Sequence, residues 1–305
     1  MTFDQVITDK YALYHGDCID VVKEIPNDSI GYSMFSPPFA DLYCYSNDPR
    51  DMGNSKGYDE FFTHFGFLIS ELHRVLIPGR SVSIHCIDIP AMQERDGYIG
   101  LKDFPGDIIR AFQKEGFIYH SRVTIWKNPL IEATRTKAIG LMHKQLCKDS
   151  SRCRQGLPDY VITMRKQGEN PNPINHGDGF SDFIGENEPT QTGLKYSHEV
   201  WRRYASPIWM DIRQSRTLSL EGARDSKDEK HICPLQLDTI ERCMALWSKK
   251  GDTFLTPFAG IGSEACIAVK MERLPIAIEL KPTYYQQMCF NVESYAKQTK
   301  HESMF

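Results

Sequence analysis

The stretch TPFAGIGSEA, residues 256–265, constrains the fold more than any other part of the sequence. It joins an apolar strand pattern to a helix pattern through a turn that contains Gly260 and Gly262. Glu279 ends the next predicted strand, about twenty residues on, where an acid can bind ribose hydroxyls. This arrangement predicts a βαβ unit that binds a nucleoside. Because only about forty residues follow the stretch, the other strands of its sheet must come from the N-terminal part of the chain.

Strand and helix patterns alternate over residues 1–126 and again over 237–296. In the first part, 28–35 has the pattern of a short buried strand. A helix pattern follows at 58–76, and the dipeptide Pro78-Gly79 should end it. Such alternation predicts an α/β fold with a Rossmann-like parallel sheet and helices on both of its faces.

The middle of the chain lacks this alternation. Residues 158–166 have the pattern of one strand, but 168–193 are rich in Gly, Pro, Asn and acids and predict a long exposed loop. We therefore expect an irregular insert at 131–227. The α/β domain would then be formed by residues 1–130 together with 228–305.

The strand pattern at 28–35 is followed by Ser36, Pro37, Pro38 and Phe39. Two adjacent prolines have fixed φ angles and no N–H to donate, so this turn holds its carbonyl oxygens free and rigid. That suits a site which accepts hydrogen bonds from an amino group, although the turn could simply end a strand. Ligands of open α/β sheets bind beyond the carboxyl ends of the strands. The turn and the glycine loop could therefore line one crevice.

The charge of the chain is unevenly distributed. The net charge is −4, yet residues 127–166 contain nine Lys or Arg against three acids, a local charge of +6. Such a segment can neutralise phosphates of nucleic acid, or it can be a solvated basic face without a partner. Under the first interpretation, four residues are expected to contact DNA: Lys137, Lys144, Arg152 and Arg154.

The cysteines and the apolar runs exclude several other classes. Nine cysteines show no C-x-x-C pair and no zinc-ligand spacing, so we expect reduced thiols and no metal site. The first residues lack the pattern of a signal peptide, and no apolar run approaches the ~20 residues that span a bilayer. The sequence therefore predicts a cytoplasmic protein with no membrane partner.

Taken together, these motifs resemble the amino-methyltransferases of DNA. The order of SPPF, a variable segment, HICPLQ and PFAGIGS is similar to the circularly permuted β class of that family, and to its phage or prophage members. The upstream stretch YHGDCIDVVKEIPNDSI is also similar to that class. The resemblance implies S-adenosylmethionine as cofactor, double-stranded DNA as substrate, a homodimer in many members, and an association with restriction-modification.

The resemblance also assigns roles to residues. Asp17 would lie beside the adenine of the cofactor, and the glycine loop would hold the rest of it. The expected cofactor-binding residues are Asp17, Cys233, Phe258, Ala259, Gly260, Gly262, Ser263 and Glu279. Most members have an acid where this chain has Thr256, which puts one cofactor contact in doubt.

The expected chemistry is transfer of a methyl group to an exocyclic amine of a base that is rotated out of the duplex. Phe39 would stack on the base, while Ser36 Oγ and the Pro37 carbonyl would accept hydrogen bonds from the amine. The resemblance implies that Ser at position 36 slightly favours cytosine N4, because adenine N6 enzymes usually have Asp or Asn there; some adenine enzymes have Ser, so both target atoms stay open. Cytosine C5 methylation needs a Pro-Cys nucleophile, and the only comparable pair, Cys233-Pro234, has the reverse order.

Three alternatives stay open on the sequence. The chain could be a DNA-binding protein without catalysis on the same fold. It could instead methylate RNA or a protein glutamine on a related turn. Because GIGSEA also matches the dinucleotide fingerprint G-x-G-x-x-G/A, a dehydrogenase is a further alternative, but that unit normally opens a domain, whereas here it lies near the C-terminal end of the sequence.

Overall fold

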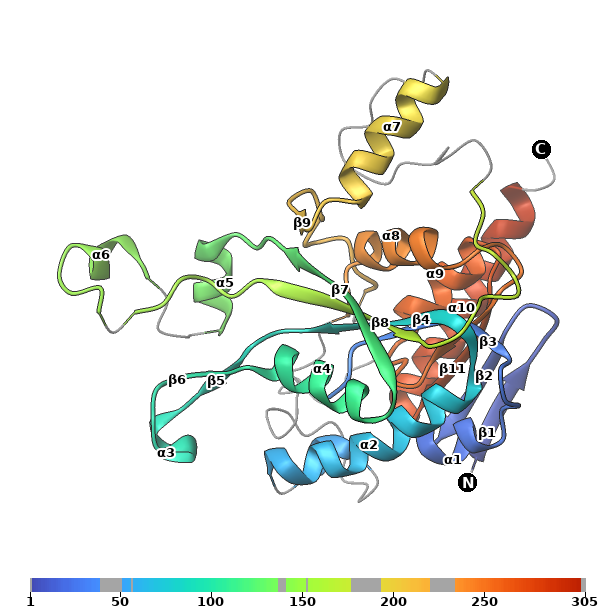
Figure 1. Ribbon diagram of the computed structural model, residues 1–305, viewed down its shortest axis with the longest axis horizontal. Coiled ribbons are helices and arrows are strands. Elements are labelled where there is room, and N and C mark those ends of the chain that lie inside the picture. Colours follow the sequence, from blue (N-terminus) through green and yellow to red (C-terminus); the bar gives the residue numbers. More distant parts are fainter. Residues whose placement is uncertain are drawn as a thin grey trace.

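The computed structural model shows a large β-sheet with helices on both of its faces (Figure 1). The structure describes residues 2–38, 51–55, 57–136, 141–151, 153–176, 193–219 and 234–302. Within these ranges the sheet has nine strands in the order β1-β2-β11-β10-β3-β4-β8-β7-β9. The bounds of these strands are β1 Thr2–Ile7, β2 Ala12–Gly16, β3 Ile30–Phe35, β4 Leu76–Cys86, β7 Phe117–Ile125, β8 Asp159–Lys166, β9 Ile208–Trp209, β10 Thr253–Thr256 and β11 Leu274–Glu279.

The two ends of the chain build the sheet together. β2, β11, β10, β3 and β4 are parallel neighbours, so β10 and β11 are inserted between strands of the N-terminal part. This confirms the prediction that the glycine-loop unit and the Ser-Pro-Pro turn share one sheet. The remainder is mixed, because β1 is antiparallel to β2 and β8 runs antiparallel between β4 and β7.

Helices cover both faces of the sheet. α1, α2 and α4 pack on one face, and α8, α9 and α10 pack on the other (Figure 1). Their bounds are α1 Cys18–Lys23, α2 Tyr58–Val75, α4 Phe104–Lys114, α8 Leu237–Trp247, α9 Ser263–Lys270 and α10 Pro282–Glu302. The shorter helices are η2 Met52–Asn54, α3 Gln93–Asp96, α5 Pro129–Thr136 and α6 His143–Leu146, and α7 spans Gly193–Tyr204.

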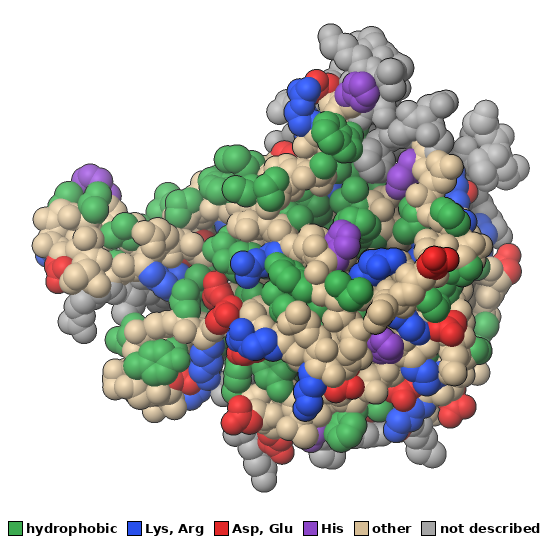
Figure 2. Space-filling model, in the orientation of Figure 1, with side chains coloured by type: hydrophobic (Ala, Val, Ile, Leu, Met, Phe, Trp, Pro, Cys, Tyr) green, Lys and Arg blue, Asp and Glu red, His purple; other side chains and the backbone are tan. Residues whose placement is uncertain are grey.

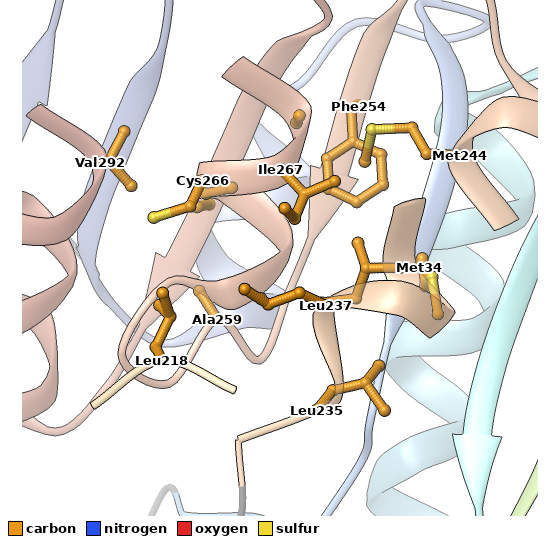
Figure 3. Packing of buried hydrophobic residues seen from close by; sticks show 14 of the residues in the cluster. Met34, Leu218, Leu235, Leu237, Met244, Phe254, Ala259, Cys266, Ile267 and Val292 are labelled. Atoms are coloured by element: carbon orange, nitrogen blue, oxygen red, sulfur yellow. The ribbon is translucent and has the colours of Figure 1, made fainter. Parts of the chain in front are cut away.

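The strands alternate their side chains between two apolar cores. In β3, Met34 belongs to the core under α8, α9 and α10, and Phe35 to the core under α1, α2 and α4. Phe254 and Leu255 of β10 divide in the same way. Figure 3 shows Met34 and Phe254 on the side of the sheet that faces α8, from which Met244 points towards them. This two-sided burial explains why these strands read as continuous apolar runs.

The stretch that we expected to be an insert, 131–227, contributes to the sheet. β8 and β9 both come from it, and β8 lies between β4 and β7 in the middle of one half of the sheet. The boundary at residue 131 therefore does not separate the sheet from the remainder. The parts of this stretch that lie outside the sheet include α5, α6 and α7, which project from it, and α5 and α6 lie on the same side as the hairpin of β5 Ile89–Ala91 and β6 Gly100–Lys102 (Figure 1).

The helix at 58–76 ends without the break that its sequence predicts. α2 ends at Val75 and β4 begins at Leu76, so Pro78 and Gly79 lie inside the strand. Gly79 has φ +75°, and a Cβ there would lie 2.6 Å from the backbone nitrogen of Asn170. Glycine is therefore required at this position by the close approach of the chain that follows β8.

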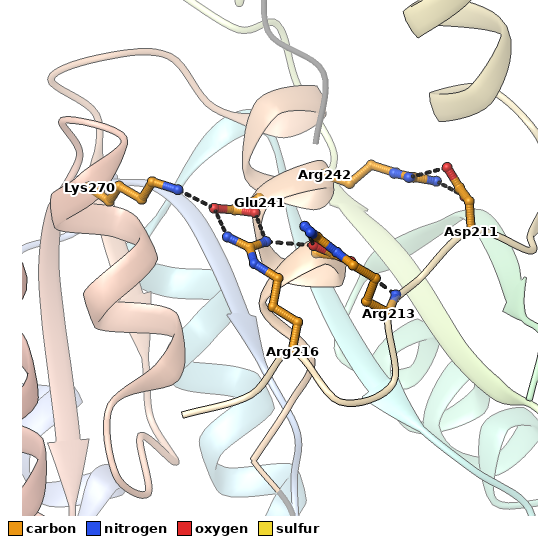
Figure 4. Close-up of polar contacts among 7 residues, drawn as sticks. Asp211, Arg213, Arg216, Glu241, Arg242 and Lys270 are labelled. Carbon is orange, nitrogen blue, oxygen red and sulfur yellow. Dashed lines mark hydrogen bonds and ion pairs between the residues drawn. The ribbon is translucent and has the colours of Figure 1, made fainter. Parts of the chain in front are cut away.

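A network of arginines holds the segment after β9 against α8 (Figure 4). Arg213 Nη2 donates to Asp238 Oδ1 over 2.7 Å, and Arg216 bridges Asp238 and Glu241. Lys270 of α9 reaches Glu241 from the other side, at 2.7 Å. The side chains of Asp238 and Glu241 are completely buried. Because buried carboxylates need such partners, the network fixes residues 211–219 on the helical layer.

Candidate active site

Two turns lie next to each other at the carboxyl edge of the parallel strands. β3 and β10 are parallel neighbours, with Ser33 opposite Leu255 and a hydrogen bond of 2.8 Å from Ser33 Oγ to the Leu255 carbonyl. The turn that begins at Ser36 follows β3, and the glycine loop follows β10. The structure therefore places the two predicted motifs on adjacent strands, where ligands of open α/β sheets bind.

Glycine is required at the two positions of the loop for different structural reasons. Both have positive φ, +54° at Gly260 and +92° at Gly262. A Cβ on Gly262 would lie 2.9 Å from Cγ of Met288, so this residue allows α10 to pack closely. A Cβ on Gly260 would meet nothing within 4 Å in the described part of the chain. Gly260 thus borders open space, as a residue that lets a ligand approach the backbone should.

Glu279 at the end of β11 holds the loop in place. Its Oε2 accepts a hydrogen bond of 2.8 Å from Gly260 N, and its Oε1 accepts one of 2.8 Å from Lys281 N. Burial raises the pKa of Glu279 to about 7, against the lowering effect of these two donors, and Asp51 raises it further. The acid therefore lies where the sequence predicts it, with both oxygens engaged by the backbone.

Asp17 lies at the carboxyl end of β2, the strand next to β11. Its Oδ1 caps α1 by accepting hydrogen bonds from Ile19 N at 2.9 Å and Asp20 N at 3.0 Å. Asp17 and Glu279 are thus the terminal acids of neighbouring parallel strands. The cap gives Asp17 a structural role, and its contact with the adenine of a cofactor stays a prediction.

Phe258 connects the glycine loop to the Ser-Pro-Pro turn. Its ring centroid lies 5.6 Å from that of Phe35, the last residue of β3, and 6.5 Å from that of Phe65 on α2. The next residue, Ala259, is buried and its N–H donates to the Ile278 carbonyl over 2.9 Å. These contacts fix the loop relative to the turn.

A chain of polar side chains leads from Ser36 into the protein. Ser36 Oγ lies 2.9 Å from Nδ1 of His85, and Nε2 of His85 lies 3.2 Å from Oδ2 of Asp159. Lys127 Nζ pairs with Asp159 Oδ1 at 2.5 Å. Asp159 is 1% exposed and His85 8%. Ser36 is therefore the outer end of a row of close polar contacts whose middle members, His85 and Asp159, are buried.

The antiparallel direction of β8 makes this chain possible. His85 lies near the end of β4, whereas Asp159 is the first residue of β8, so the reversed strand brings its beginning to the edge where β4 ends. Burial opposes the charge of Asp159, but the nearby His85 ring and the Lys127 ammonium outweigh it and hold the pKa of this carboxyl below its usual range. The site thus contains an ionised carboxylate directly behind His85.

Sequence reasoning missed His85, Asp159 and Lys127. The strand patterns that contain the first two were recognised, but nothing in them showed that β8 would run antiparallel to β4. A signal was present, since His85 lies near the end of its predicted strand, as Ser36 does, and polar residues at such ends face the ligand edge.

Some predicted site residues lie outside the described part of the chain: Phe39, Cys233, Lys137 and Arg152. The described ones at the ligand edge are Ser36, Pro37, Pro38, Asp17, Phe258, Ala259, Gly260, Gly262, Ser263 and Glu279. Ser263 is the buried first residue of α9. The structure therefore gathers every described residue of the predicted catalytic and cofactor sets on one edge of the sheet.

The two described basic candidates, Lys144 and Arg154, lie within residues 141–154, here called the α6 arm, of which residue 152 is not described. Lys144 is an exposed residue of α6, and Arg154 lies after it, where its carbonyl accepts a hydrogen bond of 2.7 Å from Leu141 N. Figure 2 shows Lys and Arg side chains spread over the viewed face and mixed with acids. Contact between this arm and DNA stays a prediction.

In the described ranges, no cluster of three or more His, Cys, Asp or Glu side chains could hold a metal ion. The cysteines described there are free. No helix in the same ranges is long and apolar enough to cross a bilayer.

Comparison with known proteins gives a consistent result. The family model for DNA methylase (N6_N4_Mtase) matches residues 33–289, most of the chain. The type II methyltransferase M.MjaI of Methanocaldococcus jannaschii is 25% identical over 237 residues, 73% of this chain and 69% of that protein. M.BamHI of Bacillus amyloliquefaciens is 23% identical over 90% of this chain, which spans only 55% of that protein.

Solved structures share the fold. A candidate DNA modification methylase from Thermus thermophilus, in complex with S-adenosyl-L-methionine, superimposes with a TM-score of 0.65 and 22% identity, over 93% of this chain and 95% of that one. The PvuII DNA methyltransferase, specific for cytosine N4, gives a TM-score of 0.64 and 15% identity over 98% and 95% of the two chains. These likenesses establish a Rossmann-like methyltransferase fold.

Proposed function

Since the chain belongs to the DNA methylase family, we propose that it transfers the methyl group of S-adenosylmethionine to an exocyclic amino group of a base in DNA. The observation that carries this proposal is the placement of the Ser36 turn and the glycine loop after adjacent parallel strands. A donor held by one and an amine held by the other would lie close enough to react.

The residues of the glycine loop fit the cofactor. The open space at Gly260 lets a ligand reach the backbone, and Glu279 lies beside it. Thr256 Oγ1 is buried at the end of β10 without a hydrogen-bond partner in the described part of the chain. A buried hydroxyl of this kind can be satisfied by a polar ligand. When bound, the cofactor supplies an electrophilic sulfonium methyl group.

The Ser36 turn fits an amino group. Ser36 Oγ and the Pro37 carbonyl are acceptors, and neither Pro37 nor Pro38 has an N–H to offer. Two acceptors match the two N–H donors of an exocyclic amine. A base in duplex DNA reaches such a turn only after rotation out of the stack, and Phe39 is the proposed aromatic platform for it.

Several finer features belong to the same proposal. Ser36 favours cytosine N4 slightly over adenine N6 as the target. The order of the two motifs in the chain supports the permuted β class, and the stretch 131–227, apart from its strands, would recognise the DNA sequence. A homodimer and a phage or prophage origin stay predictions.

The proposal is tested by incubating the protein with methyl-labelled S-adenosylmethionine and genomic DNA, followed by mass spectrometry of the digested nucleosides. N4-methylcytosine or N6-methyladenine is the expected product. Ser36→Ala should lose most of this activity while binding the cofactor normally in calorimetry. 5-Methylcytosine would overturn the mechanism, and label found only in RNA or in protein would overturn the choice of substrate. DNA binding without transfer would support the non-catalytic alternative.

A further inference from the structure

We propose that His85 acts on the reaction through Ser36: it orients the hydroxyl so that its oxygen faces the target amine as an acceptor, and it takes up the proton that the amine loses. This inference rests on the proposed methyl transfer and adds a residue to it. It follows from the row of contacts that joins Ser36, His85, Asp159 and Lys127, in which His85 and Asp159 are buried.

The ionised state of Asp159 determines which nitrogen of His85 carries the hydrogen. An ionised carboxylate can only accept, so the nitrogen of His85 that faces it, Nε2 at 3.2 Å, carries the hydrogen. In a neutral imidazole, Nδ1 is then an acceptor. The 2.9 Å contact between Ser36 Oγ and Nδ1 must therefore be a bond that the hydroxyl donates. The remaining lone pairs of Ser36 Oγ are left to accept from a ligand.

The direction of the hydrogen bond between Ser36 and His85 determines which ligand groups the turn can bind. With its hydrogen committed to His85, Ser36 can accept a hydrogen bond from an amine but cannot donate one to a carbonyl oxygen or a ring nitrogen. The Pro37 carbonyl has the same limitation. The turn therefore distinguishes an amino group from a keto group, which is the difference between cytosine and thymine at the same ring position.

Burial supports a role beyond packing. Asp159 and His85 are almost completely inaccessible, and an ionised carboxylate in such a place is costly unless partners compensate for its lost hydration. Lys127 compensates on one side, at 2.5 Å, and His85 on the other. A carboxylate that is held ionised behind a histidine stabilises the histidine when it becomes positively charged.

The charged groups around His85 can be assigned by face. Asp159 lies on the same face of the sheet as His85 and its cross-strand partner Val161, towards α8, α9 and α10, and Lys127 contacts Asp159. Cys86 and its cross-strand partner Tyr160 point to the opposite face, where Tyr160 contacts Asp88 and Arg122. Asp159, and Lys127 behind it, are therefore the charged groups that face His85.

Methyl transfer to the amine, followed by proton transfer to Ser36 and His85, conserves atoms and charge. The amine lone pair forms the new N–C bond while the S–C bond breaks. The electron pair of the S–C bond goes to sulfur. The amine, positively charged after the transfer, gives a proton to Ser36 Oγ as the hydroxyl hydrogen of Ser36 moves to Nδ1 of His85. The imidazolium beside Asp159 later releases this proton to solvent.

The experiment measures single-turnover methylation of DNA as a function of pH. The wild-type rate should fall on acidification, because a histidine that is already protonated on both nitrogens cannot take another proton. His85→Gln should lower the rate roughly 10²-fold or more, the usual range for loss of positioned proton transfer, and should lose the acid fall. Affinities for cofactor and DNA should stay within about twofold of wild type.

His120 provides a matched control. It lies on β7, where its Nδ1 is 3.0 Å from Ser121 Oγ, and it is exposed. His120→Gln should leave the rate and its pH dependence unchanged. If His85→Gln misfolds, Asp159→Asn and the wild-type pH profile carry the test. The role of His85 would be overturned if the wild-type methylation rate did not fall at low pH, or if His85→Gln methylated DNA as fast as wild type. Either result would leave the proposed methyl transfer intact. A wild-type protein that methylates no DNA would overturn the proposed function itself.

Discussion

Glu279 Oε2 accepts a hydrogen bond of 2.8 Å from the backbone N–H of Gly260, so the last residue of β11 holds the loop that follows β10. The same carboxylate accepts from Lys281 N and thereby fixes the start of α10. One acid thus sets the relative positions of three elements that border the proposed cofactor site. Hydrogen bonds to Glu279 therefore fix the conformation of the glycine loop. Substitutions at Gly260 and Gly262 are expected to have different effects.

Gly260→Asp should lower the affinity for S-adenosylmethionine more than tenfold, about 1.4 kcal/mol, without a large loss of stability. The side chain would enter the space that Gly260 leaves open, and Asp tolerates the left-handed φ of +54° better than most residues. Calorimetry with the cofactor and thermal melting of the free protein provide the two measurements. Unchanged affinity would place the cofactor elsewhere.

Gly262→Ala should mainly lower the stability of the protein, whereas Gly260→Asp mainly lowers the affinity for the cofactor. The φ of Gly262 is +92° and its Cβ would lie 2.9 Å from Met288 Cγ, so the substitution strains the loop and displaces α10. We expect a loss of roughly 1–3 kcal/mol in the free energy of unfolding. Denaturant titration measures it, and a variant as stable as wild type would show that α10 shifts without cost.

Arg216→Met should destabilise the fold by roughly 3–5 kcal/mol, because it leaves the buried carboxylates of Asp238 and Glu241 without one of their partners. Lys297→Ala is the control. It breaks an exposed pair with Glu293 on α10 and should change stability by less than about 1 kcal/mol. Equal effects of the two variants would contradict the importance assigned to the network in Figure 4.

Glu264 predicts a pH dependence of stability. Burial in the first turn of α9 raises its pKa to about 8, so the folded protein binds this proton more tightly than the unfolded chain does. The group therefore contributes stability at low pH that is lost as the pH rises from about 4.5 to about 8. Glu264→Gln should melt at a higher temperature than wild type at pH 8, and this difference should shrink at pH 5.

Neutralising Lys144 and Arg154 together should weaken binding to all DNA sequences alike. Each phosphate contact that is lost should reduce the slope of log K against log salt by about 0.9. Lys250→Ala is a suitable control. Lys250 lies in the turn before β10, and it forms an exposed ion pair with Glu272. Fluorescence anisotropy over a range of salt concentrations measures the slope. A double variant with an unchanged slope would remove the α6 arm from the DNA interface.

The sequence predicted the elements whose signals are local. The strands around Ser36 and Thr256 read as apolar runs between turn residues, and the helix at 263–270 follows a glycine turn. The direction of β8 could not be predicted, because the same residues would suit a strand in either direction. His85 and Asp159 therefore stayed unconnected, since only the antiparallel register brings them together. The end of α2 was predicted to within one residue, but the start of β4 at Leu76 was missed, because its tertiary pairing begins before Pro78.

The position of β10 between β11 and β3 has a consequence for biosynthesis. Ser33 is bonded to a residue 222 positions further along the chain, so β3 has no partner on that side while the ribosome makes the intervening segment. The nascent chain exposes a strand edge and two half-built cores until β10 and β11 emerge. Such long-range pairing slows folding and invites wrong contacts in the meantime. We expect this protein to depend on chaperones during synthesis more than an α/β protein of equal size whose strands pair in sequence order.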